Sequence, residues 1–439
     1  MGIGLDGTQC WADTAQRPGP LDLAVIGYSS PFMSDATERF PPTRTAAIEA
    51  LTAFLPHAGR KYAVRRNYDL GRDAHNGVSQ LSPYIRARLL TEQEVLQATL
   101  ARHSLSAAEK FVQEVYWRTY WKGWLEMRPG AWRQYRQSLN RNLDDIQTQA
   151  GLRGRWEAAC KGETDIDCFN AWAQELTETG YMHNHARMWF ASIWIFTLRL
   201  PWELGADFFI RHLLDGDPAS NTLGWKWVAG LQTLGKHYVA RPGNIERYTE
   251  GRFAPHVQLA VDPAPLAGTP HPERRLLPSS EFPQSGLRTG LLLHDEDLSP
   301  GFVVDQSPDI VSTVAIGGRH KLSPLEIAPH VSEFSDGAIA DVLVRFGGRL
   351  GKVMPVQSYD DIAGWARDAG LEQIVTPYAP VGPTADLIED LRSLTGIRIA
   401  AVQRPYDAAA WPHATGGFFK FKEKIPKLVA ELKGLQAAE

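Results

Sequence analysis

The sequence predicts an all-helical domain followed by a doubly wound parallel α/β domain, and three observations carry this prediction. The chain has 439 residues, which is more than one hydrophobic core usually organises, so two domains are expected. Helical spacing of apolar residues prevails over residues 43–253, whereas short apolar strands alternate with helices over residues 290–439. Between them, residues 254–289 are rich in proline and predict an extended linker, and residues 1–42 predict an irregular arm.

The composition is that of an ordinary globular protein, with 44% hydrophobic and 22% charged residues. The formal net charge of −4 excludes a polycation that binds nucleic acid indiscriminately. Residues 60–155 are nevertheless rich in arginine, which indicates either a solvated helix face or a phosphate-binding surface.

Neither a membrane segment nor a disulfide framework is expected. The most apolar run, residues 188–200, is too short to cross a bilayer, and the chain does not open with a signal-peptide pattern. Cys10, Cys160 and Cys168 form no CxxC pair, so we expect no disulfide, iron–sulfur centre or other metal site. The prediction is a cytoplasmic monomer.

Two helix starts are predicted in the first half of the helical domain. Thr43 is a good N-terminal cap for the helix that follows it. Ser106 with Glu109 three residues on has the spacing of a capping box. The helix after Ser106 is crowded with aromatic side chains on most of its circumference, which predicts that it is buried.

The aromatic stretch 180–227 is the part of the chain that most favours a ligand site. A helix stops before Pro201, and a second apolar run ends in the turn DGDP at residues 215–218. Asp215 and Asp217 either cap the following helix or point inward, where they need donors such as Arg187 or ligand hydroxyls.

The C-terminal half predicts a parallel sheet. Short apolar runs are strand candidates at residues 287–294, 311–318, 339–348, 351–357, 372–378 and 398–403. Helical patterns at residues 359–370 and 384–396 lie between the later strands. Neither a GxGxxG nor a P-loop motif indicates a nucleotide in this half.

Three motifs, HNHARM (183–188), LPWELG (200–205) and DGDPASNTLGWKW (215–227), resemble the flavin-binding signature of the DNA photolyase/cryptochrome family in order and spacing. The resemblance implies FAD as the cofactor and a helical FAD-binding domain at residues 43–253. The α/β half resembles the antenna domain that the family places first, so the domain order implies a circular permutation. A second, antenna chromophore stays undetermined.

The resemblance also implies cofactor contacts before the flavin signature. Segment 67–82 is similar to the family stretch in which a tyrosine and an arginine precede a phosphate-binding turn, although Val78 and Gln80 depart from the usual Thr and Arg. The implied cofactor residues here are Tyr68, Arg72, Gly77, Ser79, Gln80, Leu81 and Ser82.

The remaining site residues follow from the other motifs. EVYWR resembles the family helix that lines the cavity for the damaged pyrimidine pair, and Arg118 within it corresponds to a flavin contact. The implied catalytic residues are Glu114, Trp117, Asn184, Met188 and Trp227, and the implied flavin contacts are Asn184, Arg187, Asp215, Asp217 and Asn221. Trp225 and Trp202 correspond to the first two tryptophans of the photoreduction chain, whereas Ile146 stands near the third. Electrons are therefore expected either to leave through Trp156, Tyr181 or Trp194 or to reach the surface inefficiently.

The favoured function is that of a cyclobutane pyrimidine dimer photolyase, in which an electron passes from excited reduced FAD to a dimer flipped out of UV-damaged DNA. The alternative is a cryptochrome-like light sensor or redox flavoprotein without repair, favoured by the altered phosphate turn and by Ile146. A helical interaction protein with an empty pocket is the third reading. It leaves the polar residues in apolar surroundings unexplained.

Overall fold

The described chain begins within the predicted arm. A computed structural model describes residues 34–255, 259–307, 309–356 and 359–435. Most of the arm therefore lies outside the described residues, and its last part forms a short helix capped by Ser34.

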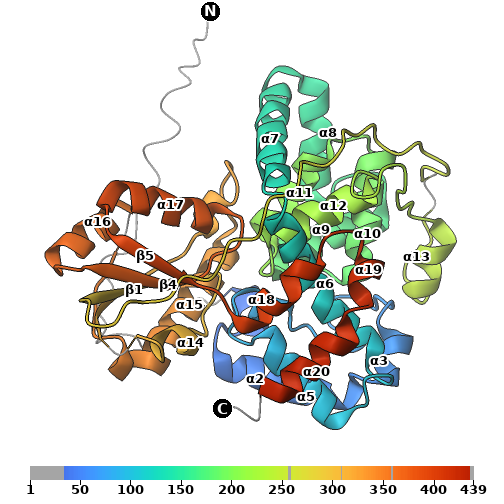
Figure 1. Cartoon of the computed structure of the whole chain (residues 1–439). Helices are drawn as coiled ribbons and strands as arrows, with labels where there is room; N and C mark the ends of the chain where they lie inside the picture. Colours follow the sequence, from blue (N-terminus) through green and yellow to red (C-terminus); the bar gives the residue numbers. More distant parts are fainter. Residues whose placement is uncertain (1–33, 256–258, 308, 357–358, 436–439) are drawn as a thin grey trace, which may run out of the picture. The chain divides into compact units, whose positions relative to one another are not determined.

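Helices occupy the chain from the arm to the linker (Figure 1). They are α1 (Asp35–Arg39), α2 (Arg44–Phe54), α3 (Arg60–Arg65), α4 (Ser82–Arg86), α5 (Glu92–Arg102), α6 (Glu109–Glu126), α7 (Gly130–Thr148), α8 (Ala150–Lys161), α9 (Asp167–Thr179), α10 (Asn184–Ser192), α11 (Trp202–His212), α12 (Pro218–Val228) and α13 (Pro242–Tyr248). A π-helical turn, Ile193–Thr197, follows α10. Residues 259–288 contain neither helix nor strand.

Capping explains where two of these helices begin. The Thr43 side chain accepts a hydrogen bond from the Ala46 N–H (3.2 Å), as predicted. The capping box predicted for α6 is wrong, because the Ser104 hydroxyl takes the Ala107 N–H (3.3 Å) and α6 begins after Ala108 without a side-chain cap. A capping box is present instead on α5, where Thr91 and Glu94 satisfy each other's backbone N–H groups.

The second half forms a five-stranded parallel sheet, which confirms the predicted doubly wound α/β class. The strands are β1 (Thr289–His294), β2 (Ile310–Ile316), β3 (Lys352–Val353), β4 (Gln373–Pro377) and β5 (Arg398–Val402), in the order β3-β2-β1-β4-β5. The helices between them are α14 (Gly301–Val304), α15 (Pro329–Phe346), α16 (Tyr359–Asp368) and α17 (Pro383–Thr395). Residues 339–348, grouped above with the strand candidates, are the end of α15 and a following turn.

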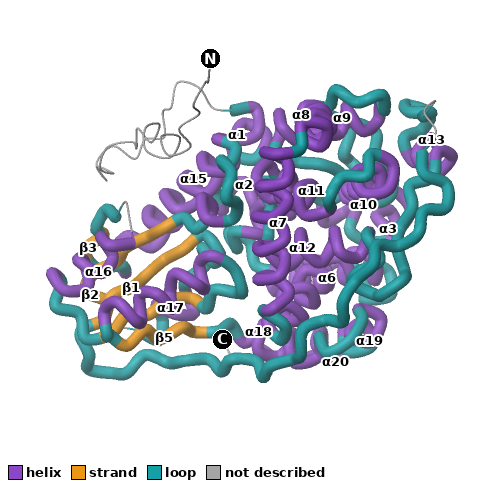
Figure 2. The backbone as a smooth tube through the Cα atoms, turned by 90° about the horizontal axis from the view of Figure 1, so that it is seen from above, coloured by secondary structure: helices purple, strands orange, loops and turns teal. Residues whose placement is uncertain are grey.

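Both faces of the sheet are covered, as its nearly continuous apolar strands require. Leu292 packs in a cluster with residues of α16 and α17, whereas Leu291 and Leu293 pack in the larger cluster that includes α14 and α15. This alternation follows from the period of two along a strand. Figure 2 shows the sheet between these helices.

The segment after β5 does not stay with the sheet. Its helices α18 (Pro405–Ala410), α19 (Phe418–Lys422) and α20 (Ile425–Leu435) pack against α5 and α6 (Figure 1). The Tyr120 hydroxyl donates to the Gly416 carbonyl (2.8 Å), and the Phe418 ring lies on the Trp117 ring. The sequence prediction assigned all of 290–439 to the α/β domain, but an amphipathic helix pattern does not say which core its apolar face joins.

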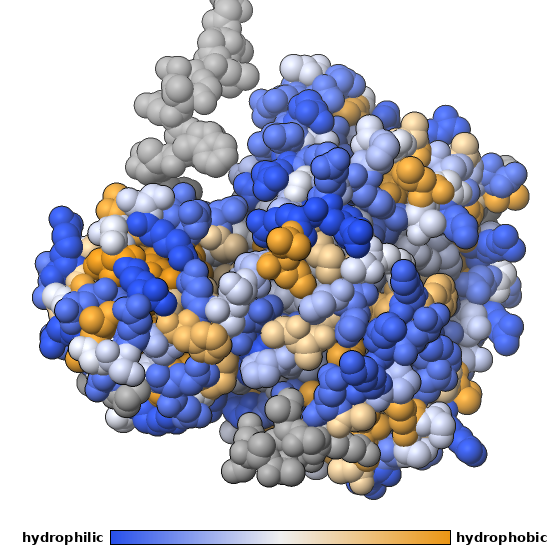
Figure 3. All heavy atoms as spheres, in the orientation of Figure 1, coloured by the Kyte–Doolittle hydropathy of each residue, from blue (hydrophilic) through white to orange (hydrophobic). Residues whose placement is uncertain are grey.

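The face of the molecule drawn in Figure 3 is mostly hydrophilic. Figure 3 shows hydrophobic residues on one face in small separate groups, which is usual for a protein surface. None of the described helices has the length and apolar composition needed to cross a membrane.

A buried ionic cluster around Arg88 connects the end of α4 to the sheet and to α18. The Arg88 guanidinium lies 2.7 Å from an Asp407 carboxylate oxygen, 3.1 Å from Asp297 and 3.2 Å from Glu92. Arg404 supplies a second cation to Asp297. All three carboxylates and Arg88 are buried, so each charge depends on its partners.

Replacing Arg88 by Met is expected to destabilise the protein by about 3–5 kcal/mol, because three buried carboxylates lose their shared cation. Chemical denaturation followed by far-UV circular dichroism measures this change. The matched control is Arg349→Met, which removes an exposed pair with Asp305 and is expected to cost about 0–1 kcal/mol. Equal effects of the two substitutions would contradict the role of the Arg88 cluster.

Candidate functional site

A cavity of about 610 Å³ lies among the helices. Its walls come from α3, α4, α6, α10, α11 and α12 and from the loop that joins the last two. This volume is typical of pockets that enclose a cofactor or a small ligand. Most of the predicted site residues line it: Ser79, Ser82, Glu114, Trp117, Arg118, Asn184, Arg187, Met188, Asp215, Asp217, Asn221, Trp225 and Trp227.

Tyr68 and Arg72 are not brought to the cavity. The Arg72 guanidinium forms ion pairs with Asp35 and Glu178, and Tyr68 packs edge-to-face on Tyr248 at 5.1 Å between ring centroids. A sequence motif fixes the order of residues, but it does not fix which side of a loop each side chain faces, so the predicted contacts of Tyr68 and Arg72 with the cavity are not formed.

The predicted phosphate turn is divided in the same way. Ser79 and Ser82 line the cavity, but Gly77, Gln80 and Leu81 do not. A Cβ at Gly77 would come within 2.8 Å of the Arg65 carbonyl oxygen, so this glycine permits a close backbone approach. The Gln80 amide turns back to the His75 carbonyl (3.3 Å), and Leu81 is fully buried in the core.

Trp225 lines the cavity, whereas Trp202 lies outside its lining. Of the predicted exits, Trp194 packs edge-to-face on Trp225, with ring centroids 6.1 Å apart. Trp202 lies against Tyr135 at 5.6 Å, and Tyr135 lies against Trp132 at 5.2 Å. The sequence analysis did not identify this aromatic pair on α7, because it lies far from the flavin motifs.

Asp217 both caps the following helix and pairs with cations beside the cavity, the two roles that the sequence left open. Its side chain accepts the Ser220 N–H (2.7 Å) and so caps α12. The same carboxylate lies 3.4 Å from Arg118 and 3.5 Å from Lys122. Asp215 pairs with Arg187 through two hydrogen bonds of 3.0 and 2.9 Å, the bidentate geometry that best compensates a buried carboxylate.

These contacts keep both aspartates ionised. Burial raises the pKa of Asp215, but the guanidinium of Arg187 outweighs it and the net pKa is lowered. Burial likewise raises the pKa of Asp217, and the neighbouring Lys122, Arg118 and Arg86 bring it well below its usual range. The loop therefore presents two negative charges beside the cavity.

Glu114 has a partner that the sequence analysis did not assign to the site. Arg66, just after α3, forms an ion pair with Glu114, and both line the cavity. Burial raises the pKa of Glu114, and Arg66 only partly offsets this rise. Arg66 belongs to a run of basic residues, a weak signal that does not separate it from its solvent-exposed neighbour Arg65.

Trp117, which lines the cavity, is supported by an aromatic residue of α19. The Trp117 ring stacks on Phe418 of α19 with centroids 3.6 Å apart and planes 11° apart. One face of this indole is therefore covered, and Trp117 presents its remaining surface to the cavity.

His183 and His185 flank Asn184 in the HNH motif. Burial lowers the pKa of His183 to about 3, so this ring is neutral at pH 7. His185 lines the cavity, bonds the Asn67 carbonyl (2.9 Å) and stacks on Trp189 at 4.1 Å. The two histidines hold the start of α10, which carries Asn184 and Arg187.

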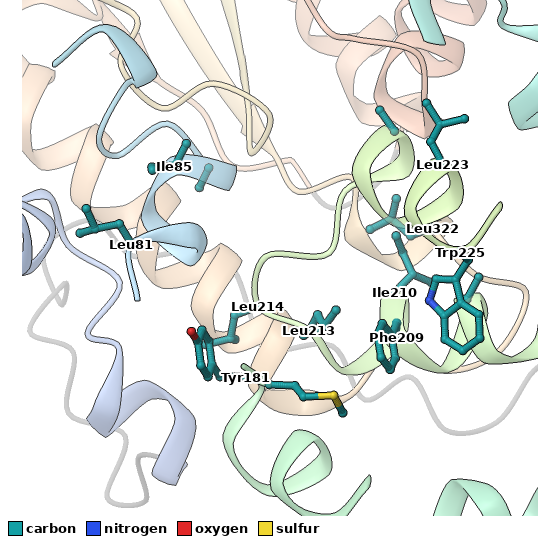
Figure 4. Close-up of a cluster of buried hydrophobic side chains, with 14 of the residues drawn as sticks. Leu81, Ile85, Tyr181, Phe209, Ile210, Leu213, Leu214, Leu223, Trp225 and Leu322 are labelled. Atoms are coloured by element: carbon teal, nitrogen blue, oxygen red, sulfur yellow. The ribbon is translucent and has the colours of Figure 1, made fainter. Parts of the chain in front are cut away.

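The lining fits FAD by its chemistry. Arg118 Nε and the Ser220 hydroxyl are buried without a hydrogen-bond partner among the described residues, and both residues line the cavity. Such groups cost free energy unless a ligand satisfies them. Phosphate and hydroxyl oxygens of FAD can do so, while apolar walls such as Phe209 and Trp225 suit a flat ring system (Figure 4).

Comparisons with known proteins agree with this fit. The family model of the FAD binding domain of DNA photolyase matches residues 111–251. The deoxyribodipyrimidine photo-lyase of Synechococcus sp. is 32% identical over 223 residues, which are 48% of this chain and 44% of the relative. That of Escherichia coli K12 is 28% identical over 218 residues, 49% of this chain and 44% of the relative.

A solved structure of a bacterial class III photolyase from Agrobacterium tumefaciens superposes with a TM-score of 0.41 at 26% identity, over 49% of this chain and 44% of that one. The chain thus matches less than half the length of each of these relatives. The matched residues 111–251 contain α10, α11, α12 and all but the first two residues of α6, and these helices supply most of the cavity lining. This segment is therefore similar to the FAD binding domain of DNA photolyase.

Proposed function

We propose that this chain is a light-driven, FAD-dependent photolyase that splits cyclobutane pyrimidine dimers in UV-damaged DNA. The observation that carries the proposal is a single cavity with two kinds of lining. Asp215, Arg187 and Arg118 form its polar side, and Glu114 and Trp117 of α6 line the same space. FAD is the cofactor of the matched domain.

Reduced FAD, when bound, supplies the excited-state electron donor. On the protein side, Arg187 and Arg118 orient the two aspartates and compensate their charges. Asn221 donates its side-chain amide to the Ala206 carbonyl (2.7 Å), which fixes the orientation of the residue assigned to the flavin N5 position. Asn184 and Met188 border the same space from α10.

Substrate contact is assigned to the other side of the cavity. Trp117 and Trp227 supply stacking surfaces for bases extruded from the duplex. Glu114 and Arg66 together place hydrogen-bond donors and acceptors where a pyrimidine edge would lie, and the cation can stabilise negative charge that develops on the dimer.

The remaining parts of the proposal concern organisation. The α/β region, residues 289–402, follows the helical FAD region in sequence and is proposed as a circularly permuted antenna-like domain. The protein is proposed to be a cytoplasmic monomer that binds DNA through its arginine-rich segment, residues 60–155. The linker assignment of residues 254–289 is supported by the lack of helix and strand in residues 259–288.

The deciding experiment is repair of a thymine-dimer oligonucleotide by the FAD-loaded, photoreduced protein under near-UV or blue light without oxygen. Light-dependent loss of the dimer, absent in a dark control, is expected. Stable, photoreducible FAD without dimer loss would overturn repair and leave a cryptochrome-like sensor.

Replacing Glu114 by Ala is expected to lower repair per absorbed photon by roughly tenfold while FAD content stays the same, because a buried hydrogen bond to the substrate is lost. Dimer loss by chromatography and flavin absorbance measure the two quantities. Glu109→Ala is the matched control, since Glu109 lies on the same helix, is largely exposed and does not line the cavity. Repair by E114A at the control's level would remove Glu114 from the substrate site.

Replacing Trp225 by Phe is expected to abolish most photoreduction of oxidised flavin, because the indole at the cavity wall is the first electron donor. Absorbance during blue-light illumination with an external thiol follows this process. The same variant, reduced chemically beforehand, is expected to keep repair. Trp365→Phe on α16 is the control, and photoreduction of W225F at its rate would contradict the assignment.

A further inference from the structure

The loop at residues 213–217 connects α11 to α12 and carries both aspartates of the cavity. It contains neither helix nor strand, and hydrogen bonds of the helical pattern reach only its two ends: the Leu213 N–H donates to the Phe209 carbonyl (2.8 Å), and the Asp217 carbonyl accepts the Asn221 N–H (2.9 Å). Its position therefore depends on contacts from other parts of the chain. One of these contacts comes from the α/β region, outside the segment that the family model matches.

Arg319, which follows β2, reaches two carbonyl groups of this loop. Its Nη2 donates to the Leu214 carbonyl (3.0 Å), and its Nη1 lies 3.5 Å from the Gly216 carbonyl. The residue is only 3% exposed. On the same Gly216 carbonyl, Arg86 of α4 donates from Nε at 2.7 Å, so two guanidinium groups meet at one peptide.

The sheet holds Arg319 in place. Its Nε lies 3.3 Å from the Asp295 carboxylate at the end of β1. That carboxylate is itself fixed by the Gly318 N–H (3.1 Å) and by the Ser335 hydroxyl of α15 (2.8 Å). Leu322, three residues after Arg319, is buried in the main apolar core and does not line the cavity (Figure 4).

The positive charge of Arg319 explains why this buried side chain bonds the loop carbonyls. Burial lowers the pKa of Arg319 to about 10, so the group stays protonated at neutral pH and needs acceptors. The two loop carbonyls and Asp295 are those acceptors. Because a trans peptide directs its N–H opposite its C=O, a Leu214 carbonyl held by Arg319 turns the Asp215 N–H to the other side.

We propose that Arg319 is a positioning residue of the FAD site. It fixes the peptide planes that carry Asp215 and Asp217, and it makes the α/β region a necessary part of cofactor binding in this chain. The inference rests on the proposed function only in that the cavity binds FAD, and it requires no repair activity.

The test is titration of the full-length apoprotein with FAD, followed by flavin fluorescence and by visible circular dichroism of the bound flavin. Arg319→Met is expected to weaken FAD binding by about tenfold or more and to alter the visible spectrum, because charged hydrogen bonds to the loop are lost. Arg319→Lys is expected to bind with intermediate affinity, since an ammonium group cannot span both carbonyls. If R319M does not fold, R319K carries the test.

Leu322→Ala separates positioning from stability. It removes an apolar contact of the same segment and is expected to lower the unfolding midpoint while FAD affinity stays at the wild-type value. Arg398→Met, at an exposed bond on β5, is the control for loss of an arginine.

Wild-type FAD affinity in both folded Arg319 variants, or a loss in L322A that matches R319M, would overturn the positioning role. Lack of FAD binding by the wild type would instead overturn the cofactor assignment itself.

Discussion

The buried charges of the loop at residues 213–217 are the constraint on which the rest of the site depends. Asp215 and Asp217 lose hydration because they are buried, so their charges need nearby cations. Five cations from four parts of the chain surround the loop: Arg187 of α10, Arg118 and Lys122 of α6, Arg86 of α4, and Arg319 after β2. The charges of this loop are therefore compensated by elements that are far apart in the sequence.

The same network connects the helical region to the sheet. Lys122 lies 3.5 Å from Asp217 and 3.9 Å from Glu296, and Glu296 accepts a hydrogen bond from Arg86 (2.6 Å). A buried charge at the cavity is thus two contacts away from the end of β1. An isolated buried ion costs free energy, so separating the two regions would leave several charged side chains without their partners at once. The FAD site and the α/β region are therefore parts of one folded unit in physical terms.

Helix α6 has a comparable double role. One side lines the cavity with Glu114, Trp117 and Arg118, and the other side is covered by the segment that follows the sheet. Phe418 stacks on Trp117, so the last helices of the chain support a wall of the site. The helices that follow β5 therefore pack against the helical region, on the proposed substrate side of the cavity.

The sequence by itself determined what depends on local pattern. It predicted the helical first half, the parallel sheet, the similarity to a flavin-binding family and thirteen residues of the cavity lining, because hydrophobic period, turn residues and a long motif can all be recognised along the chain. It did not determine which residues of the turn at 77–82 reach the cavity, that Arg66 pairs with Glu114, or that α18 to α20 return to α6. These features bring together residues up to hundreds of positions apart. Only tertiary packing decides them, because the free energy of burying a charge or an apolar face depends on which partner meets it in space.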